Sequence, residues 1–300
     1  MLAGDLDAVD RVLCVAFATV RGLDDPATAF GDADLARTRF RAAPDAAWVA
    51  ELDGEVVGSV FAARWGTFGF FGPLSVDPAL WDRRIASRLL EPVLEAFEQW
   101  ELQQAGLFTF AGSPRHLGLY GKHGFSPGAP TVIAAKPTDP GARGAYELAS
   151  GESDVDGIRG LTDQVFPGLD LTREILAAQA QGIGETILVR GDGTLDGVAV
   201  CHRGAGSEAG SDTCYLKFAA TRPGEGAAVR FELLLDACEA FAAESGLGRL
   251  VAGVSAGRLD AHRRLLARGF DVERAGVSMW LRPDAPRFDT PEDYVIDDLR

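Results

Sequence analysis

The pattern of apolar and polar positions repeats along the chain. Residues 48–64 (WVAELDGEVVGSVFAAR) and 186–203 (TILVRGDGTLDGVAVCHR) each contain two apolar runs around an Asp-Gly turn. Because Asp-Gly favours the backbone of a two-residue turn, each stretch predicts a β-hairpin. Each hairpin is followed by another apolar strand, a polar turn containing proline (Pro78 or Pro223), and a long apolar-rich helix.

The helix predicted after Pro78 carries apolar residues at intervals of three and four. This spacing places them on one face, as expected of a helix that packs on a sheet. Packing accounts for the stripe, so it does not indicate a cofactor site. The residues are Ile85, Leu89, Leu90, Val93, Leu94, Phe97 and Trp100.

The repeat preserves both order and spacing. Pro78 is followed 145 positions later by Pro223, and Gly124 is followed at the same distance by Gly269. Ordered features at one offset indicate a tandem duplication. Each half is predicted to run helix, hairpin, strand, helix, strand, short helix, strand. This order predicts an α+β (α/β layered) fold in which a mixed, mostly antiparallel sheet is flanked by helices.

We predict two domains, residues 1–136 and 145–300, joined by a Pro- and Gly-rich linker at 137–144. A length of 300 residues agrees with two domains. The final residues 290–300 (TPEDYVIDDLR) combine acidic side chains with Tyr294, Val295 and Ile296. We therefore expect a C-terminal arm, either docked across the halves or added as an edge strand.

The net charge of −15 argues against binding to nucleic acid or to an anionic membrane, because both need a basic surface. It is compatible with a cationic or amine substrate. We find no run long and apolar enough to span a membrane and no basic-then-apolar leader, so we expect a cytoplasmic protein. The four cysteines and four histidines show no spacing typical of disulfides or metal sites. We therefore expect no metal.

Three segments of the N-terminal half resemble the GNAT N-acetyltransferase superfamily. They are the strand end 76–78 (VDP), the turn into the helix at 81–86 (WDRRIA), and 119–125 (LYGKHGF). The C-terminal half shows the same segments in weaker form, so the resemblance covers both halves. It implies two tandem GNAT-like domains.

The resemblance implies that the first half binds acetyl-CoA as a co-substrate. In this family, amides at the helix start hold the pyrophosphate, an arrangement that the helix dipole favours. The strand end holds the pantetheine arm through its main chain, and a tyrosine matching Tyr120 commonly protonates the leaving thiolate. The cofactor contacts implied here are Ser75, Val76, Arg83, Arg84, Ile85, Ala86, Ser87 and Ser113.

Each half departs from the family pattern. In the first half Arg84 stands where the first glycine is usual, so Arg83 and Arg84 would supply charge to the phosphates. In the second half Glu225 brings a negative charge into the turn, and Leu265 replaces the tyrosine. We therefore expect an active first half and a degenerate second half.

Two functions are compatible with the sequence. One is an N-acetyltransferase in which a small-molecule or protein amine attacks acetyl-CoA directly. The alternative is a non-catalytic module that binds acyl-CoA and acts through regulation. Tyr120 could instead be a packing residue, and Ser113 a helix N-cap. The acceptor pocket is expected at residues 17–45 and in the crevice between the halves.

Two further patterns do not change this interpretation. Glu51, Glu55 and Glu95 are possible proton acceptors, but nothing in the sequence selects one of them. Residues 253–257 (GVSAG) match the nucleophile elbow of hydrolases. Only His262 follows this motif, seven residues after Ser255, so we do not expect a hydrolase.

Overall fold

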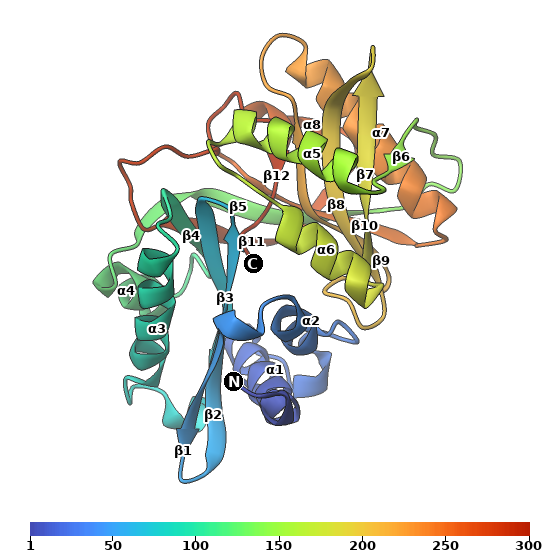
Figure 1. The fold of residues 1–300 in the computed structure, drawn as a ribbon. Helices are drawn as coiled ribbons and strands as arrows, with labels where there is room; N and C mark the ends of the chain where they lie inside the picture. The colour runs from blue at the N-terminus through green and yellow to red at the C-terminus, as the bar shows by residue number, and fades with distance from the viewer.

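The computed structural model describes residues 1–300, whose strands form one twelve-stranded sheet. Its order is β1-β2-β3-β4-β11-β5-β10-β9-β8-β7-β6, and β12 pairs with β9. Figure 1 shows the N-terminal half, in blue and green, and the C-terminal half, in yellow and red, at opposite ends of this sheet. The predicted α+β architecture of two tandem units is confirmed.

The N-terminal half follows the predicted order, with one short helix, α2, that the sequence pattern did not reveal. Its elements are α1 (Leu6–Arg21), α2 (Leu35–Ala42), β1 (Ala47–Leu52), β2 (Glu55–Trp65), β3 (Phe68–Val76), α3 (Ile85–Gln99), β4 (Gln104–Thr109), α4 (Pro114–Lys122) and β5 (Ser126–Pro137).

The C-terminal half repeats this series after a two-residue strand, β6 (Glu147–Leu148). Here too one short helix, α6, was not predicted. The elements are α5 (Glu152–Val165), α6 (Thr172–Gln181), β7 (Gly184–Gly191), β8 (Thr194–Gly204), β9 (Gly210–Thr221), α7 (Ala227–Glu244), β10 (Arg249–Ser255), α8 (Leu259–Ala267), β11 (Asp271–Trp280) and β12 (Val295–Ile296).

Local sequence explains the main elements. At the tip of the β1–β2 hairpin Asp53 and Gly54 both have positive φ, as the predicted tight turn requires. Along α3 the inward side of the predicted stripe is buried against the sheet, with Leu90, Val93 and Phe97 fully enclosed. These contacts place the start of α3 at the carboxyl end of β3.

The last strands of the two halves are exchanged. β11 pairs antiparallel with β4 of the N-terminal half, and β5 pairs antiparallel with β10 of the C-terminal half. The two exchanged strands also pair with each other at the centre of the sheet. The predicted linker, 137–144, follows β5 in the sequence. The sheet does not end there, because the backbones of β5 and β11 are hydrogen-bonded across the halves. Each half therefore completes its sheet with a strand of the other.

The predicted C-terminal arm is docked across both halves: its strand pairs in the C-terminal half, and Leu299 joins the core cluster that contains Phe68 and Phe70 of β3. Val295 and Ile296 form β12 and pair with Ala220 and Ala219 of β9. The arm is not an edge strand, because it lies inside the sheet where β9 and β10 diverge. Its apolar side chains, including Val295 and Leu299, are buried in the core.

Candidate functional site

The strands β3 and β4 lie parallel and then diverge. They pair from Phe68 with Gln104 to Phe70 with Gly106, and β3 continues beyond that point without a partner on this side. A β-bulge at Gly72–Pro73 interrupts the pairing of β3 with β2 just where the strands separate. The result is a V-shaped opening whose walls are β3 and β4.

A cleft of about 1270 Å³ occupies this opening and extends into the crevice between the halves. Its walls include the end of β3, the turn before α3, the end of β4, and α4. On the other side they include α1, the segment 29–35, and parts of β5, β9, β10 and β11. The cleft lies in the region, residues 17–45 and the crevice between the halves, where the acceptor pocket is expected, and that it binds an acceptor stays a prediction.

The turn before α3 presents free backbone amides to the cleft. None of the N–H groups from Asp82 to Ser87 donates to another protein group. Arg84, the N-cap of α3, adopts φ 63°, a left-handed conformation that normally favours glycine. The backbone therefore keeps the glycine-type conformation although the side chain is arginine. Of the predicted contacts in this turn, Arg84, Ile85, Ala86 and Ser87 line the cleft and Arg83 does not.

The predicted contacts on β3 also lie in the cleft wall. Asp77 N–H donates to Val57 on β2, and amides alternate sides along a strand, so the Val76 N–H faces the opening. The carbonyl of Val76 accepts from the Trp81 indole at 2.9 Å. Ser75 is buried with its Oγ 2.9 Å from Ser59 Oγ, so its side chain supports the hairpin.

Tyr120 of α4 lies in the wall of the cleft and packs against β3. Its ring packs edge-on against Phe71 at 5.7 Å, and the residue is only 5% exposed. Burial raises the pKa of Tyr120 to about 12, partly offset by a hydrogen bond with Thr109. The phenol is therefore protonated throughout the neutral range and available as a proton donor.

Ser113 is the N-cap of α4 and does not line the cleft. Its Oγ accepts from the backbone N–H of His116 at 3.5 Å and lies 2.6 Å from Nδ1 of the same histidine. His116 does line the cleft. Burial and the neighbouring Arg115 lower the pKa of His116, so its ring is neutral at pH 7. No motif in the sequence singled out His116, and only the fold brings it to the cleft.

The same opening in the C-terminal half is filled. β9 and β10 pair from Thr213 to Leu216 and then diverge, and β12 of the arm takes the vacated edge. The N–H of Thr221, which corresponds to Val76, donates to the carbonyl of Tyr294 in the arm at 3.2 Å. Leu265, at the position of Tyr120, is fully buried.

A buried arginine fastens the arm in this second opening. Arg258 occupies the position that Ser113 holds in the first half. It donates to the carbonyl oxygens of Phe288 and Val295 and pairs with Asp297 at 2.5 Å. Burial raises the pKa of Asp297, although Arg258 opposes that shift.

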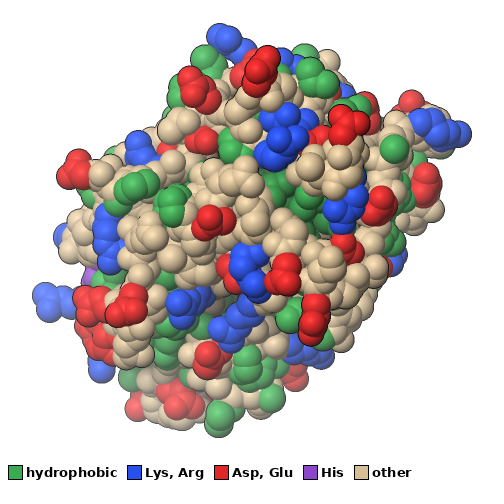
Figure 2. All heavy atoms as spheres, turned by 45° about the horizontal axis from the view of Figure 1, so that its top comes forward, with side chains coloured by type: hydrophobic (Ala, Val, Ile, Leu, Met, Phe, Trp, Pro, Cys, Tyr) green, Lys and Arg blue, Asp and Glu red, His purple; other side chains and the backbone are tan.

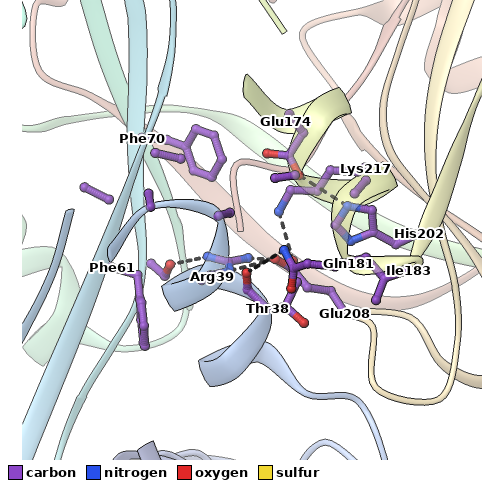
Figure 3. Close-up of a pocket in the computed structure, with 17 residues that line it drawn as sticks. Thr38, Arg39, Phe61, Phe70, Glu174, Gln181, Ile183, His202, Glu208 and Lys217 are labelled. Atoms are coloured by element: carbon purple, nitrogen blue, oxygen red, sulfur yellow. Dashed lines mark hydrogen bonds and ion pairs between the residues drawn. The ribbon is translucent and has the colours of Figure 1, made fainter. Parts of the chain in front are cut away.

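A buried cluster of ionised side chains joins the two halves beside the cleft (Figure 3). Glu208 accepts from Arg39 of α2 at 2.8 Å and from Lys217 of β9 at 2.9 Å. Burial would raise the pKa of Glu208, but these two cations hold it well below its usual range. Arg39 also donates to the carbonyl of Gly72 in the β3 bulge. The cluster therefore holds the bulge in place from the C-terminal half.

The other candidates from the sequence lie elsewhere. Glu51, Glu55 and Glu95 are exposed and do not line the cleft. Ser255 is buried at the end of β10, where its Oγ accepts from the Gly257 N–H at 3.2 Å. No helix in the structure has the length and apolarity to cross a bilayer. Acidic and basic side chains are interspersed over the face seen in Figure 2.

Residues 17–125 match the model of the acetyltransferase (GNAT) family. The matched segment contains the opening, the turn before α3, and α4. This part of the chain matches the GNAT family, and the second half is built on the same fold. Members of the family are N-acetyltransferases that bind acyl-CoA. No curated protein sequence is similar enough to count as a relative.

Solved structures with the same fold extend over nearly the whole chain. A protein of Pyrococcus horikoshii assigned as an acetyltransferase superposes with a TM-score of 0.70 at 14% identity, covering 99% of this chain and 92% of its own. A GCN5-related N-acetyltransferase from Sphaerobacter thermophilus gives 0.62 at 16%, covering 97% and 96%. A tandem GNAT protein from the clavulanic acid biosynthesis pathway gives 0.57 at 14%, covering 93% and 96%.

Proposed function

We propose that the protein is an N-acetyltransferase that transfers acetyl from acetyl-CoA to an amine in the cleft of its N-terminal half. The observation that carries the proposal is the open divergence of β3 and β4, with unpaired amides at the start of α3 and Tyr120 in the cleft wall. The C-terminal half lacks the open strand edge, which β12 occupies, and has Leu265 in place of the tyrosine. One active cleft per chain follows.

The residues present fit the parts of acetyl-CoA. The free amides of Asp82 to Ser87, the positive end of α3 and the side chain of Arg84 suit a pyrophosphate. The Val76 N–H suits an amide oxygen of the pantetheine arm. The arm itself can lie along the unpaired edge of β3, as a further strand would.

In the transfer, the neutral amine nitrogen attacks the thioester carbonyl carbon. A C–N bond forms, the C–S bond breaks, and the nitrogen loses a proton. Tyr120 donates its phenolic proton to the departing thiolate and recovers one from solvent or from the amine. His116, neutral at pH 7 and lining the same cleft, is our candidate for accepting the amine proton.

Binding and turnover can be tested separately. Calorimetry with acetyl-CoA should show binding that Arg84→Glu weakens by at least about tenfold, because it replaces a charge-assisted contact with repulsion. Arg143→Glu, which changes an exposed arginine in the linker, is the matched control and should bind normally. If neither the unmodified protein nor the Arg143→Glu variant bound acetyl-CoA, the assignment of this cleft would be wrong.

Thiol release with an amine acceptor tests the role of Tyr120. Tyr120→Phe should lower kcat by roughly 10²-fold and leave acetyl-CoA affinity unchanged, because only the transferable proton is removed. Tyr146→Phe, a tyrosine outside the cleft, should keep full activity. If Tyr120→Phe kept full activity, the assignment of the acid would be wrong. Acetyl-CoA binding with no turnover of any amine would favour the non-catalytic alternative.

A further inference from the structure

Beyond Tyr120 the cleft enters the crevice between the halves, and arginines dominate its charge there. Two acidic residues, Glu208 and Glu273, also line this part. The protein carries a net charge of −15, so this lining runs against the overall composition. The arginines come from α1, α2, β10, β11 and the arm, and they are Arg21, Arg39, Arg249, Arg274 and Arg300.

Three of these arginines are neutralised by nearby carboxylates. Arg39 pairs with Glu208, Arg249 with Glu273, and Arg300 with Asp298. The two others are not neutralised. Arg21 donates only to the carbonyl of Ala29 and has no carboxylate within 4.0 Å. The side chain of Arg274 makes no hydrogen bond and no ion pair in the protein, although its backbone pairs within β11 and β5.

Arg274 is thus a cation without a partner, placed among other cations. Arg274 remains exposed to solvent at the crevice. Partial desolvation and repulsion by Arg300 and Arg21 lower its pKa to about 10, while the charges of Asp298 and Glu273 oppose the shift. The guanidinium remains charged at pH 7. An anion bound at this point would relieve the repulsion between the arginines. It would also accept hydrogen bonds from the Arg274 guanidinium, a group that binds carboxylates and phosphates through paired hydrogen bonds.

The surface beside these arginines is apolar. Ile133 of β5, Val251 of β10 and Tyr215 of β9 form a small packed cluster and line the same part of the cleft. Arg274 is directly paired with Ile133 across β11 and β5. The crevice therefore combines an apolar floor with an uncompensated positive charge, and it opens into the chamber that contains Tyr120.

We propose that the acceptor is a carboxylate-bearing amine, such as an amino acid or a short peptide, whose carboxylate is held by Arg274 with Arg21. The proposal rests on the function proposed above. The arginines fix the anionic end of the acceptor, the apolar floor supports its side chain, and its amino group is directed toward the thioester.

The test compares matched acceptors and does not depend on turnover alone. Thiol release is measured with amino acids and with their decarboxylated amines, and calorimetry measures binding of the N-acetylated product of each. We expect the carboxylates to be preferred by at least about tenfold, the scale of one charge-assisted contact. Arg274→Gln should remove that preference by raising KM and leave acetyl-CoA affinity unchanged. Arg263→Gln, an exposed arginine on α8, is the control.

Four results would overturn the proposal while the transferase function stands. One is a preference for the decarboxylated amines. Another is exclusive use of phosphorylated amines such as O-phosphoethanolamine, which would assign the arginines to a phosphate. The third is normal acetyl-CoA binding without binding of any N-acetyl amino acid at millimolar concentration. Weaker acetyl-CoA binding in Arg274→Gln would assign Arg274 to the cofactor and also overturn the proposal. Absence of acetyl-CoA binding by the unmodified protein would instead refute the proposed function.

Discussion

The two halves contain the same V-shaped opening, and only one of them is open. Between β3 and β4 the edge of β3 is free and faces a large cleft. Between β9 and β10 the corresponding edge is paired with residues 295–296 of the chain itself. The backbone architecture of the opening is thus retained in both halves. What differs is whether the exposed strand edge is left for a ligand or is satisfied by protein.

The difference extends to the helix that follows each opening. α7 has 18 residues and α3 has 15, although both begin after a residue with positive φ. In the second half the turn is also tied internally, because Arg230 donates to the carbonyl oxygens of Arg222 and Pro223. The second half therefore keeps the glycines of the family turn but has lost the open strand edge beside it.

The largest effect expected from this comparison is in the number of ligands bound. Calorimetry at saturating acetyl-CoA should give one site per chain, because the Thr221 N–H is already bonded to the arm while the Val76 N–H is free. Thermal unfolding should show a single transition that acetyl-CoA shifts to higher temperature, since the two halves share one sheet. A stoichiometry of two would contradict the assignment of the second opening as filled.

The next effect concerns the residues at equivalent positions, Ser113 and Arg258. Arg258→Met should destabilise the protein by about 3–5 kcal/mol, because it leaves Asp297 buried without its cation. Ser113→Ala removes an ordinary N-cap and should cost about 1 kcal/mol. Urea unfolding of both variants measures the difference. Equal costs would mean that the arm contributes little to the second half.

The residues that precede α3 and α7, Arg84 and Gly226, allow opposite substitutions whose expected effects on stability are smaller. Arg84→Gly should stabilise the fold by about 1 kcal/mol, because glycine adopts positive φ without the penalty of a Cβ. Gly226→Ala, at φ 79°, should destabilise it by a similar amount. The same denaturation experiment reports both changes. If Arg84→Gly lost stability, the arginine side chain would have to make contacts that outweigh its backbone strain.

The elements with local signals could be predicted from the sequence. The Asp-Gly hairpins, the stripe of α3 and the order of elements in each half all depend on neighbours close in the chain. The cofactor-side residues of the turn and Tyr120 came from the resemblance to a family, and the cleft brings most of them together. Whether they contact acetyl-CoA stays a prediction.

The features that could not be predicted depend on contacts between distant segments. Nothing local in β5 or β11 shows that they exchange sheets, since an apolar strand can pair with any matching edge. The filling of the second opening could not be predicted either, because it depends on which strand residues 295–296 pair with. Likewise Arg21, Arg274 and Arg300 lie far apart in the sequence, and only the fold brings them to one crevice. The net charge, which is compatible with a cationic or amine substrate, could not reveal this local group of arginines.

The smallest expected difference is in the pH dependence of stability, and it again compares the halves. The pKa values of His116 on α4 and His262 on α8 are both lowered by burial, that of His116 also by Arg115. The unfolded chain therefore binds these protons more readily than the folded protein, and stability falls as pH drops below about 6.5. Melting temperatures between pH 8 and pH 5 should decline less in His116→Gln than in the unmodified protein. His262→Gln should show a weaker change, because no neighbouring cation adds to the effect of burial. If His262→Gln flattened the profile more, burial in the C-terminal half would be the stronger influence.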